Sequence, residues 1–479
     1  MNIEPFQNNS NLLENPKDFD VKIKVGEKQN NKEFKAHSII LSARSDYFKA
    51  ALSSRWARRE NGIIIFDKPN ISPSVFEILL KYIYTGTFSN NNEVNLLDIF
   101  VAADEIGLLE ISQQAKKSLR NEAFEYRRHG KFLKALEFYE DILKNCPHSA
   151  EDQKSASKWD LSYYRYGSEG IIELSKVLCK NTTLTSLNLS CIKLGSIEVE
   201  QSGVKILADA LCKNFTLKNL NLSHNNLGSE GGKALANSLY ENSTLTSLNL
   251  GYNELGSKGG KALANALCKN STLKDLNLQF NNLGSKGGKA VIESLCKNTT
   301  LKDLNLNSNE LGSEGGKALA YALYKNSALT SLELYNNNIG SEGGKAIAEA
   351  LYKNSTLTSL NLKFNNIRLG GKALANALCK NSTLIFLDLS ENALGFEGGK
   401  ALADALFKNF TLKNLNLCYN NIGSEGGKLL ENVLYKNSTL TSLRITSNYI
   451  DFELKSNNPN LKIVQFNGFT NSTHFPLYG

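Results

Sequence analysis

The sequence predicts a multidomain protein of mixed α+β and α/β class. It would have a compact N-terminal domain, a short helical linker, and a C-terminal horseshoe of parallel inner strands and outer helices. Three observations lead to this prediction. The 479 residues exceed what one ordinary core organises. About ten copies of a 28-residue unit fill the C-terminal two thirds, and residues 18–120 share none of that period.

Each repeat combines a strand pattern with a helix pattern. The strand reads L-x-x-L-x-L-x-x-N, as in Leu217, Leu220, Leu222 and Asn225, and the copy NNIRLGGKALA is one residue short. TSLNL alternates as a strand does, whereas GGKALANSLYEN places apolar residues on one helical stripe. A lone unit cannot bury both surfaces, but a stack can. Because strands pack more closely than helices, the stack bends with its strands inside.

Two repeat positions have predicted structural roles. The Asn that closes the strand pattern is expected to form an internal ladder, in which its amide satisfies backbone groups where each strand ends. The glycines of LGSEGG are expected to form the turn into the helix. GSEGGK lacks the spacing and the following Ser or Thr of a phosphate-binding loop, so we interpret it as a turn.

These residues resemble the leucine-rich repeats of the ribonuclease-inhibitor type over residues 159–469. The two ends depart from the pattern, as capping repeats do. Trp159 and Leu161 stand in a degenerate first strand, and Leu461 and Val464 in a short last one. The resemblance implies a horseshoe that binds another protein.

Residues 18–120 alternate strand and helix patterns. VKIKV at 21–25 and GIIIF are predicted strands, and FKAHSIILSARSDYFKAAL is predicted as a strand end followed by helix. Two helical stretches come after GIIIF, the first ended by Gly86. With FKAHSIILSARS and YIYTG in place, this segment resembles a BTB (POZ) domain. The resemblance implies a homodimer and, in many members, binding to a cullin scaffold of a ubiquitin ligase. The aligned cullin contacts are Trp56 and Arg58, and Arg58 reverses the expected charge.

Residues 121–150 form the predicted helical linker. EAFEYRRHGKFLKALEFYEDILKNCPHS resembles one tetratricopeptide-type helix pair. The alternative is a helical extension packed on the preceding domain, because one copy cannot make a stable array. Residues 148–158 are predicted to be a polar connection.

Composition narrows the function. The formal net charge of +8 does not indicate nucleic-acid binding, and no window approaches the ~18 apolar residues of a membrane span. Five of the eight cysteines share a repeat position with Tyr and Phe, which indicates packing in a reducing compartment rather than disulfides. We expect a protein of the cytoplasm or nucleus, without a membrane partner, whose KNST sequons are not glycosylated.

No group of residues predicts catalysis. The five histidines are scattered, without metal-ligand spacing. Cys191 and His224 share a position in successive repeats and are either a nucleophile with its base or an ordinary surface pair. His37 is interpreted as structural, at the start of a helix. We predict no enzyme, no cofactor and no metal.

Protein binding is therefore the predicted function, through the concave face and one edge. The copies differ most at the seventh and eighth positions of the strand pattern. At the fifth position most copies carry Asn, a set called here the Asn column, and three copies carry another residue. Aromatic side chains there are either anchors for a partner or rings that pack on neighbouring loops. The predicted contacts are His224, Tyr252, Phe280, Tyr335, Lys363, Phe364, Glu391 and Tyr419, with Glu333, Asp388 and Arg444 from the Asn column.

The leading hypothesis is a dimeric adaptor whose horseshoe captures an unknown protein, as the substrate receptor of a cullin ligase. Dimerisation would double the valency. One alternative is a regulator of an enzyme or a GTPase, since repeats of this type resemble those of inhibitors and of Ran GTPase-activating proteins. Another is an oligomeric scaffold without degradation, which Arg58 favours.

Overall fold

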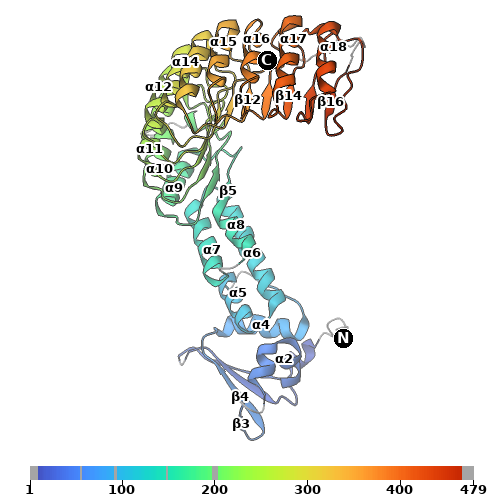
Figure 1. Cartoon of the computed structure of the whole chain (residues 1–479). Helices are drawn as coiled ribbons and strands as arrows, with labels where there is room; N and C mark the ends of the chain where they lie inside the picture. The colour runs from blue at the N-terminus through green and yellow to red at the C-terminus, as the bar shows by residue number, and fades with distance from the viewer. Residues whose placement is uncertain are drawn as a thin grey trace, which may run out of the picture. The chain divides into compact units, whose positions relative to one another are not determined.

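The computed structural model describes residues 9–27, 29–53, 57–90, 94–146, 149–196 and 203–466. The chain divides into two compact units, residues 1–156 and 157–479 (Figure 1). Each unit buries its own set of apolar side chains.

The first unit contains a four-stranded sheet in the order β2-β1-β4-β3. Its strands are β1 (Val21–Val25), β2 (Lys32–Ala36), β3 (Arg58–Glu60) and β4 (Ile63–Lys68). Strand β1 pairs antiparallel with β2 and parallel with β4. The helices are α1 (Ser10–Glu14), α2 (Ser38–Arg44), α3 (Asp46–Ala51), α4 (Pro73–Thr85) and α5 (Leu96–Glu105). The predicted strands VKIKV and GIIIF are confirmed.

Caps set the helix bounds in this unit. The Ser72 side chain accepts a hydrogen bond from the N–H of Val75, and Pro73 occupies the first turn of α4. Gly86 ends α4 with a φ of 71°, which confirms the predicted stop. The helical stretch after β2 divides into α2 and α3 at Ser45, whose Oγ accepts from the N–H of Phe48 at 3.2 Å.

Three further helices extend the first unit: α6 (Leu109–Arg128), α7 (Phe132–Asn145) and α8 (Ala150–Ser157). Ile142 of α7 belongs to the hydrophobic core of the unit, as a packed helical extension requires. The predicted polar connection was wrong over α8. Asp152 is 2% exposed and forms ion pairs with Lys116 (3.2 Å) and Arg120 of α6, so one buried polar residue attaches an otherwise largely exposed polar helix.

The second unit is a solenoid with a twelve-stranded parallel sheet inside and helices outside, as the arc in Figure 1 shows. The strands are β5 (Lys158–Asp160), β6 (Ser186–Asn188), β7 (Asn219–Asn221), β8 (Ser247–Asn249), β9 (Asp275–Asn277), β10 (Asp303–Asn305), β11 (Ser331–Glu333), β12 (Ser359–Asn361), β13 (Phe386–Asp388), β14 (Asn414–Asn416), β15 (Ser442–Arg444) and β16 (Lys462–Val464). The horseshoe is confirmed.

The outer row alternates with these strands along the chain. Its helices are α9 (Gly167–Lys180), α10 (Gly203–Lys213), α11 (Gly228–Glu241), α12 (Gly256–Leu267), α13 (Gly284–Ser294), α14 (Gly312–Lys325), α15 (Gly340–Leu351), α16 (Gly370–Leu378), α17 (Gly395–Lys408) and α18 (Gly423–Leu434), with the 3₁₀ turn η1 (Leu194–Ser196) before α10. Strand leucines and helix leucines together fill the core between the layers.

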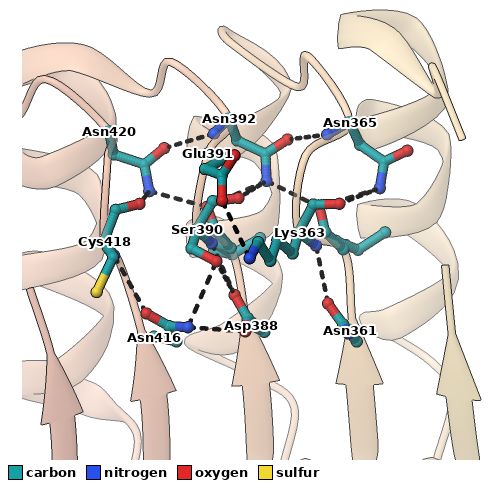
Figure 2. A network of polar contacts seen from close by, with 12 residues as sticks. Asn361, Lys363, Asn365, Asp388, Ser390, Glu391, Asn392, Asn416, Cys418 and Asn420 are labelled. Carbon is teal, nitrogen blue, oxygen red and sulfur yellow. Dashed lines mark hydrogen bonds and ion pairs between the residues drawn. The ribbon is translucent and has the colours of Figure 1, made fainter. Parts of the chain in front are cut away.

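The predicted asparagine ladder is confirmed. In Figure 2 the N–H of Asn365 donates to Oδ1 of Asn392 (3.0 Å), and the N–H of Asn392 donates to Oδ1 of Asn420 (3.1 Å). The Asn392 amide donates to one carbonyl of the preceding repeat (2.8 Å) and one of its own (3.0 Å). Equivalent asparagines from Asn225 to Asn448 are at most 2% exposed. They join each repeat to the next where the strands end.

A second asparagine ladder, which the sequence analysis missed, lies where each helix ends. The Asn298 amide donates to the carbonyls of Leu267 (2.9 Å) and Asn270 (3.1 Å) in the preceding repeat. Its Oδ1 accepts from the N–H groups of Thr300 (3.1 Å) and Leu301 (2.8 Å). Asn298 is 3% exposed and begins one of the sequons. A buried amide that donates to two carbonyls is not accessible for glycosylation.

The glycines of each repeat have two roles. Gly228, at the turn predicted from LGSEGG, has a φ of +63°. The Gly pair that follows allows neighbouring helices to approach: a Cβ on Gly316 would lie 2.6 Å from the Cα of Gly343. GSEGGK is therefore a turn and a helix contact.

The terminal repeats are atypical, as predicted. Trp159 is 2% exposed in the middle of β5, and β16 forms the short last strand. Part of the insertion in the second repeat, residues 197–202, lies outside the described ranges.

Candidate protein-binding surface

The inner face consists of the first and third residues of each strand from β5 to β16, because the middle residue points into the core. In β10, Leu304 is 1% exposed, whereas Asp303 is exposed and Asn305 is half-buried. Parallel pairing without a shift aligns Asp303 with Asp275, and Asn305 with Glu333. The inner face therefore carries columns of equivalent side chains.

From β6 to β14, all charged side chains of the inner face are carboxylates. They are Asp275, Asp303, Glu333 and Asp388. The first three line a hollow of about 510 Å³. Burial raises the pKa of Asp303 and the negative charge of Asp275 raises it further, against the lowering effects of Ser331 and Lys302. The inner-face positions of these nine strands thus carry acidic and uncharged side chains, although the chain has a net charge of +8, and the charge of Lys302, directly before β10, acts on Asp303.

Two predicted contacts, Glu333 and Asp388, differ in their environments. Glu333 is half-buried and accepts a hydrogen bond from Nδ2 of Asn361 at 2.7 Å. Its pKa is raised, first by burial and then by the charge of Asp388, against the lowering effect of Asn361. Asp388 is only 8% exposed and accepts from the N–H and Oγ of Ser390 (2.8 and 2.6 Å) and from Nδ2 of Asn416 (2.8 Å), as Figure 2 shows. Glu333 is thus better placed to meet a partner.

Predicted contacts at the eighth position form an aromatic edge of the horseshoe, comprising His224, Tyr252 and Phe280. The rings of His224 and Tyr252 stack with centroids 4.1 Å apart, and those of Tyr252 and Phe280 with centroids 4.3 Å apart. All three residues have φ between 53° and 58°, so each repeat turns outward there. Phe280 remains 38% exposed. Each ring therefore packs on its neighbour while the outer rim stays accessible, and the anchoring of a partner stays a prediction.

A second group of predicted contacts lies further along the same edge. Lys363 Nζ lies 3.0 Å from Oε1 of Glu391 and 5.4 Å from the ring centroid of Tyr335; Figure 2 shows the Lys363–Glu391 pair. The Phe364 ring lies 6.3 Å from that of Tyr335. Burial lowers the pKa of Lys363, but the hydrogen bond and charge of Glu391, together with Tyr335 and Asp388, leave the pKa raised. The lysine is therefore charged and its charge is opposed within the edge.

The remaining predicted contacts are accessible and lie towards the C-terminal repeats. Tyr419, at the eighth position, is 51% exposed. Arg444 is exposed on β15. Its side chain begins a change in the charge of the inner face, which continues with Lys462 on β16.

His224 and His37 make packing and hydrogen-bond contacts in the structure. The His224 ring stacks on Tyr252, and Cys191 has the same left-handed turn conformation, with a φ of 60°. The His37 ring contacts the Tyr84 hydroxyl at 2.8 Å and the Lys17 carbonyl at 2.9 Å at the start of α2. These contacts support the surface and structural interpretations.

Asp275 and Asp303 are inner-face residues that the sequence analysis did not select. The sequence contained the signal, because both occupy the third pattern position, where the other copies from β6 to β15 carry uncharged residues, mostly Ser or Asn. Their mutual proximity follows from zero-shift parallel pairing.

In the first unit, Arg58 lies on β3 with its side chain 73% exposed and forms an ion pair with Glu60. Trp56, the other predicted cullin contact, lies outside the described residues.

Across the described ranges, no three His, Cys, Asp or Glu side chains gather as metal ligands would. None of the described helices combines the length and apolarity needed to cross a bilayer.

Comparison with family models gives matches in both units. The BTB/POZ domain model matches residues 9–123. The Leucine Rich repeat model matches residues 180–195, 213–236, 241–264, 269–291, 297–320, 325–348, 353–375, 380–403 and 408–430. That model does not test the ribonuclease-inhibitor type, which stays a prediction.

Similar curated proteins match over part of their length. Zinc finger and BTB domain-containing protein 44 of Mus musculus is 26% identical over 143 residues, 30% of this chain and 30% of that protein. Kelch-like protein 40a of Danio rerio is 41% identical over 78 residues, 16% of this chain and 12% of that protein. Kelch repeat and BTB domain-containing protein 4 of Homo sapiens is 31% identical over 88 residues, 18% of this chain and 16% of that protein. The chain thus spans under a third of each relative.

Among solved structures, the BTB domain of zebrafish PATZ1 is 23% identical. The match covers 24% of this chain and 86% of the zebrafish chain, with a TM-score of 0.20.

Proposed function

Since the chain has an N-terminal BTB/POZ domain followed by a run of nine leucine-rich repeats, we propose that it is a protein-interaction adaptor. The first unit would dimerise and the horseshoe would capture a target protein. The observation that carries the proposal is the inner face, where accessible polar side chains stand on a rigid sheet whose strands are joined by the asparagine ladder.

The charge of the inner face supports a particular kind of target. Asp275, Asp303 and Glu333 line one hollow, and the inner-face positions from β6 to β14 hold no Lys or Arg, although Lys302 directly precedes Asp303. A target segment rich in Lys or Arg would match this potential and associate faster at low salt. The aromatic edge beside it would supply apolar contact area.

Exposed apolar side chains support dimerisation. Ile39 of α2 is 78% exposed and Leu12 of α1 is 40% exposed, and both helices contact α4. A second copy of the chain would cover such side chains. By light scattering, we expect the wild-type chain at twice the monomer mass and Ile39→Asp as a folded monomer. A monomeric wild-type chain would refute the dimer.

Photo-crosslinking tests target capture directly. A photoreactive amino acid at position 303 of the full-length chain should crosslink a partner protein in cells, because Asp303 lies in the inner hollow. The matched control is position 265 on the outer side of α12, where Asn265 is also exposed. Equal crosslinking at both positions would contradict an inner-face site.

Arg58 favours a second candidate function, an adaptor that assembles proteins without recruiting a cullin. Its exposed positive charge stands at the position where cullin-binding relatives are expected to have an acid. If Arg58 blocks recruitment, purified cullin should bind the Arg58→Glu chain more tightly than the wild-type chain. Tight binding to the wild type would instead support the ubiquitin-ligase form of the adaptor.

A further inference from the structure

A groove on the outer face of the second unit is lined by several large and exposed apolar side chains. It has a volume of about 1000 Å³ and lies between α14, α15 and α16. Tyr321, Tyr324, Tyr352 and Leu369 line it, and they are 60%, 54%, 53% and 71% exposed. Four large apolar side chains are thus accessible within one groove.

The shortened repeat explains the exposed leucine. Arg368 and Leu369 stand where other copies have three residues, Gly-Ser-Glu, Gly-Ser-Lys or, once, Gly-Phe-Glu. Arg368 has a φ of 47° and takes over the turn conformation of the missing glycine. Leu369 consequently fills the position that Glu342 has in the preceding repeat, directly before the Gly pair. The deletion replaces a charge on the outer face with an apolar side chain.

The same positions between α10, α11 and α12 provide an internal comparison. That groove is about 610 Å³. Cys212 stands there at the position of Tyr324, and Asn237 and Asn265 show what two other repeats carry at the position of Tyr321. An ordinary stack of repeats therefore leaves a smaller groove, and specific substitutions, not the fold, create the larger apolar one.

The charges also differ between the two grooves. Lys345, Lys353 and Lys372 line the larger groove against one carboxylate, Glu349. The smaller groove balances Lys233 with Glu241. Lys353 Nζ lies 5.1 Å from the ring centroid of Tyr324. Lys345 and Lys372 have exposed ion-pair partners outside the groove lining, and such pairs are weak. The excess of positive charge favours a partner that brings carboxylates.

The groove has a floor of small side chains, Ala320, Ala348 and Ala377. Small side chains between tyrosine walls admit a bulky apolar side chain, and buried aromatic contacts of this kind dominate binding energies. A flat lipid surface would not fill such a groove. We propose that the groove binds an acidic segment of a partner protein, with an apolar side chain inserted between the tyrosines and Leu369. This proposal does not depend on the inner face.

The test uses the full-length protein and random peptides displayed on phage. The double variant Tyr321→Asn and Leu369→Lys restores the residues that other repeats have at these positions, such as Asn237 and Lys258. We expect wild-type protein to select peptides that combine Asp or Glu with bulky apolar residues. Their affinity by fluorescence anisotropy should fall about tenfold or more in the double variant. Tyr240→Ala, in the smaller groove, should bind them like the wild type.

Several results would overturn the proposal. These are the absence of selected peptides, selection of Lys- and Arg-rich peptides, and equal losses in Tyr240→Ala and the double variant. Binding of phosphatidylserine vesicles in place of peptides, lost in the double variant, would assign the groove to a membrane surface. Circular dichroism confirms that each variant is folded. Because Asp275→Lys with Asp303→Lys should leave peptide binding unchanged, failure of this proposal is distinguishable from failure of the inner-face proposal.

Discussion

Replacing Asn309 with alanine tests whether the asparagine ladder holds the solenoid together. Asn309 is fully buried, and its Oδ1 accepts from the N–H groups of Asn281 (3.1 Å) and Leu283 (3.3 Å) in the preceding repeat. Its amide donates to the carbonyls of Leu278 (2.8 Å) and Leu306 (3.1 Å). Alanine removes all of these bonds at once.

The cost can be worked out from the partners that remain. The carbonyl of Leu278 still accepts from Asn281 Nδ2, and that of Leu306 still accepts from Asn337 Nδ2. The N–H groups of Asn281 and Leu283 lose the acceptor that holds them. Each buried and unsatisfied donor costs about 1–3 kcal/mol. We therefore expect Asn309→Ala to lower the free energy of unfolding by about 2–6 kcal/mol.

Urea denaturation followed by far-UV circular dichroism measures this loss, and hydrogen exchange at residues 281–283 locates it. The matched control is Asn265→Ala, since Asn265 is exposed on α12 and alanine favours helix. We expect the control to unfold at the wild-type urea concentration within error. If Asn309→Ala unfolds there too, the ladder does not stabilise the repeats.

Three further predictions concern a buried carboxylate, a half-buried carboxylate and one pair of stacked rings. Burial raises the pKa of Asp152, but hydrogen bonds from Ser149, Arg120 and Lys116 leave it lowered. The ionised form of Asp152 therefore stabilises the fold above the unfolded pKa of about 3.9, and this stabilisation is lost as the pH falls. Asp152→Asn should therefore cost about 3–5 kcal/mol at pH 7 and much less in acid, measured by urea denaturation against pH. Burial raises the pKa of Glu333, so the ionised form of this side chain destabilises the fold. Glu333→Gln should therefore raise the melting temperature at pH 7. This gain should vanish below the unfolded pKa of about 4.3, where Glu333 is protonated in both states. A double-mutant cycle of Tyr252→Ala and Phe280→Ala should give a coupling of about 0.5–1.5 kcal/mol from ring stacking, whereas a coupling near zero would contradict the stacked edge.

The repeat architecture could be predicted from the sequence because nearly every copy has the same pattern of buried leucines and the same Asn. The leucine spacing defines the strand, and the Asn after it has one role that nine buried copies confirm. The second ladder was missed because Asn298 and its equivalents sit in apparent sequons at the helix ends, where polar residues are ordinary. Only the stacking of repeats shows that their amides bond to the preceding helix.

The candidate surface was harder to predict, because its properties arise between repeats. Asp275 and Asp303 form one electronegative region only when β9 and β10 pair without a shift. Asp388 broke the Asn column and so was selected, yet its hydrogen bonds leave it 8% exposed. The helix α8 was missed because its buried anchor, Asp152, is a charged residue whose partners lie on α6. Local pattern does not reveal such pairs.

Quantitative affinity capture with full-length chains tests whether the inner face captures a target protein. Wild type is compared with Asp275→Lys combined with Asp303→Lys, two exposed inner-face substitutions. We expect both chains to be dimers by light scattering, and we expect the charge-reversed chain to lose a defined set of proteins that the wild type retains. Retention of the same proteins by both chains would contradict an adaptor that captures its target through the inner face.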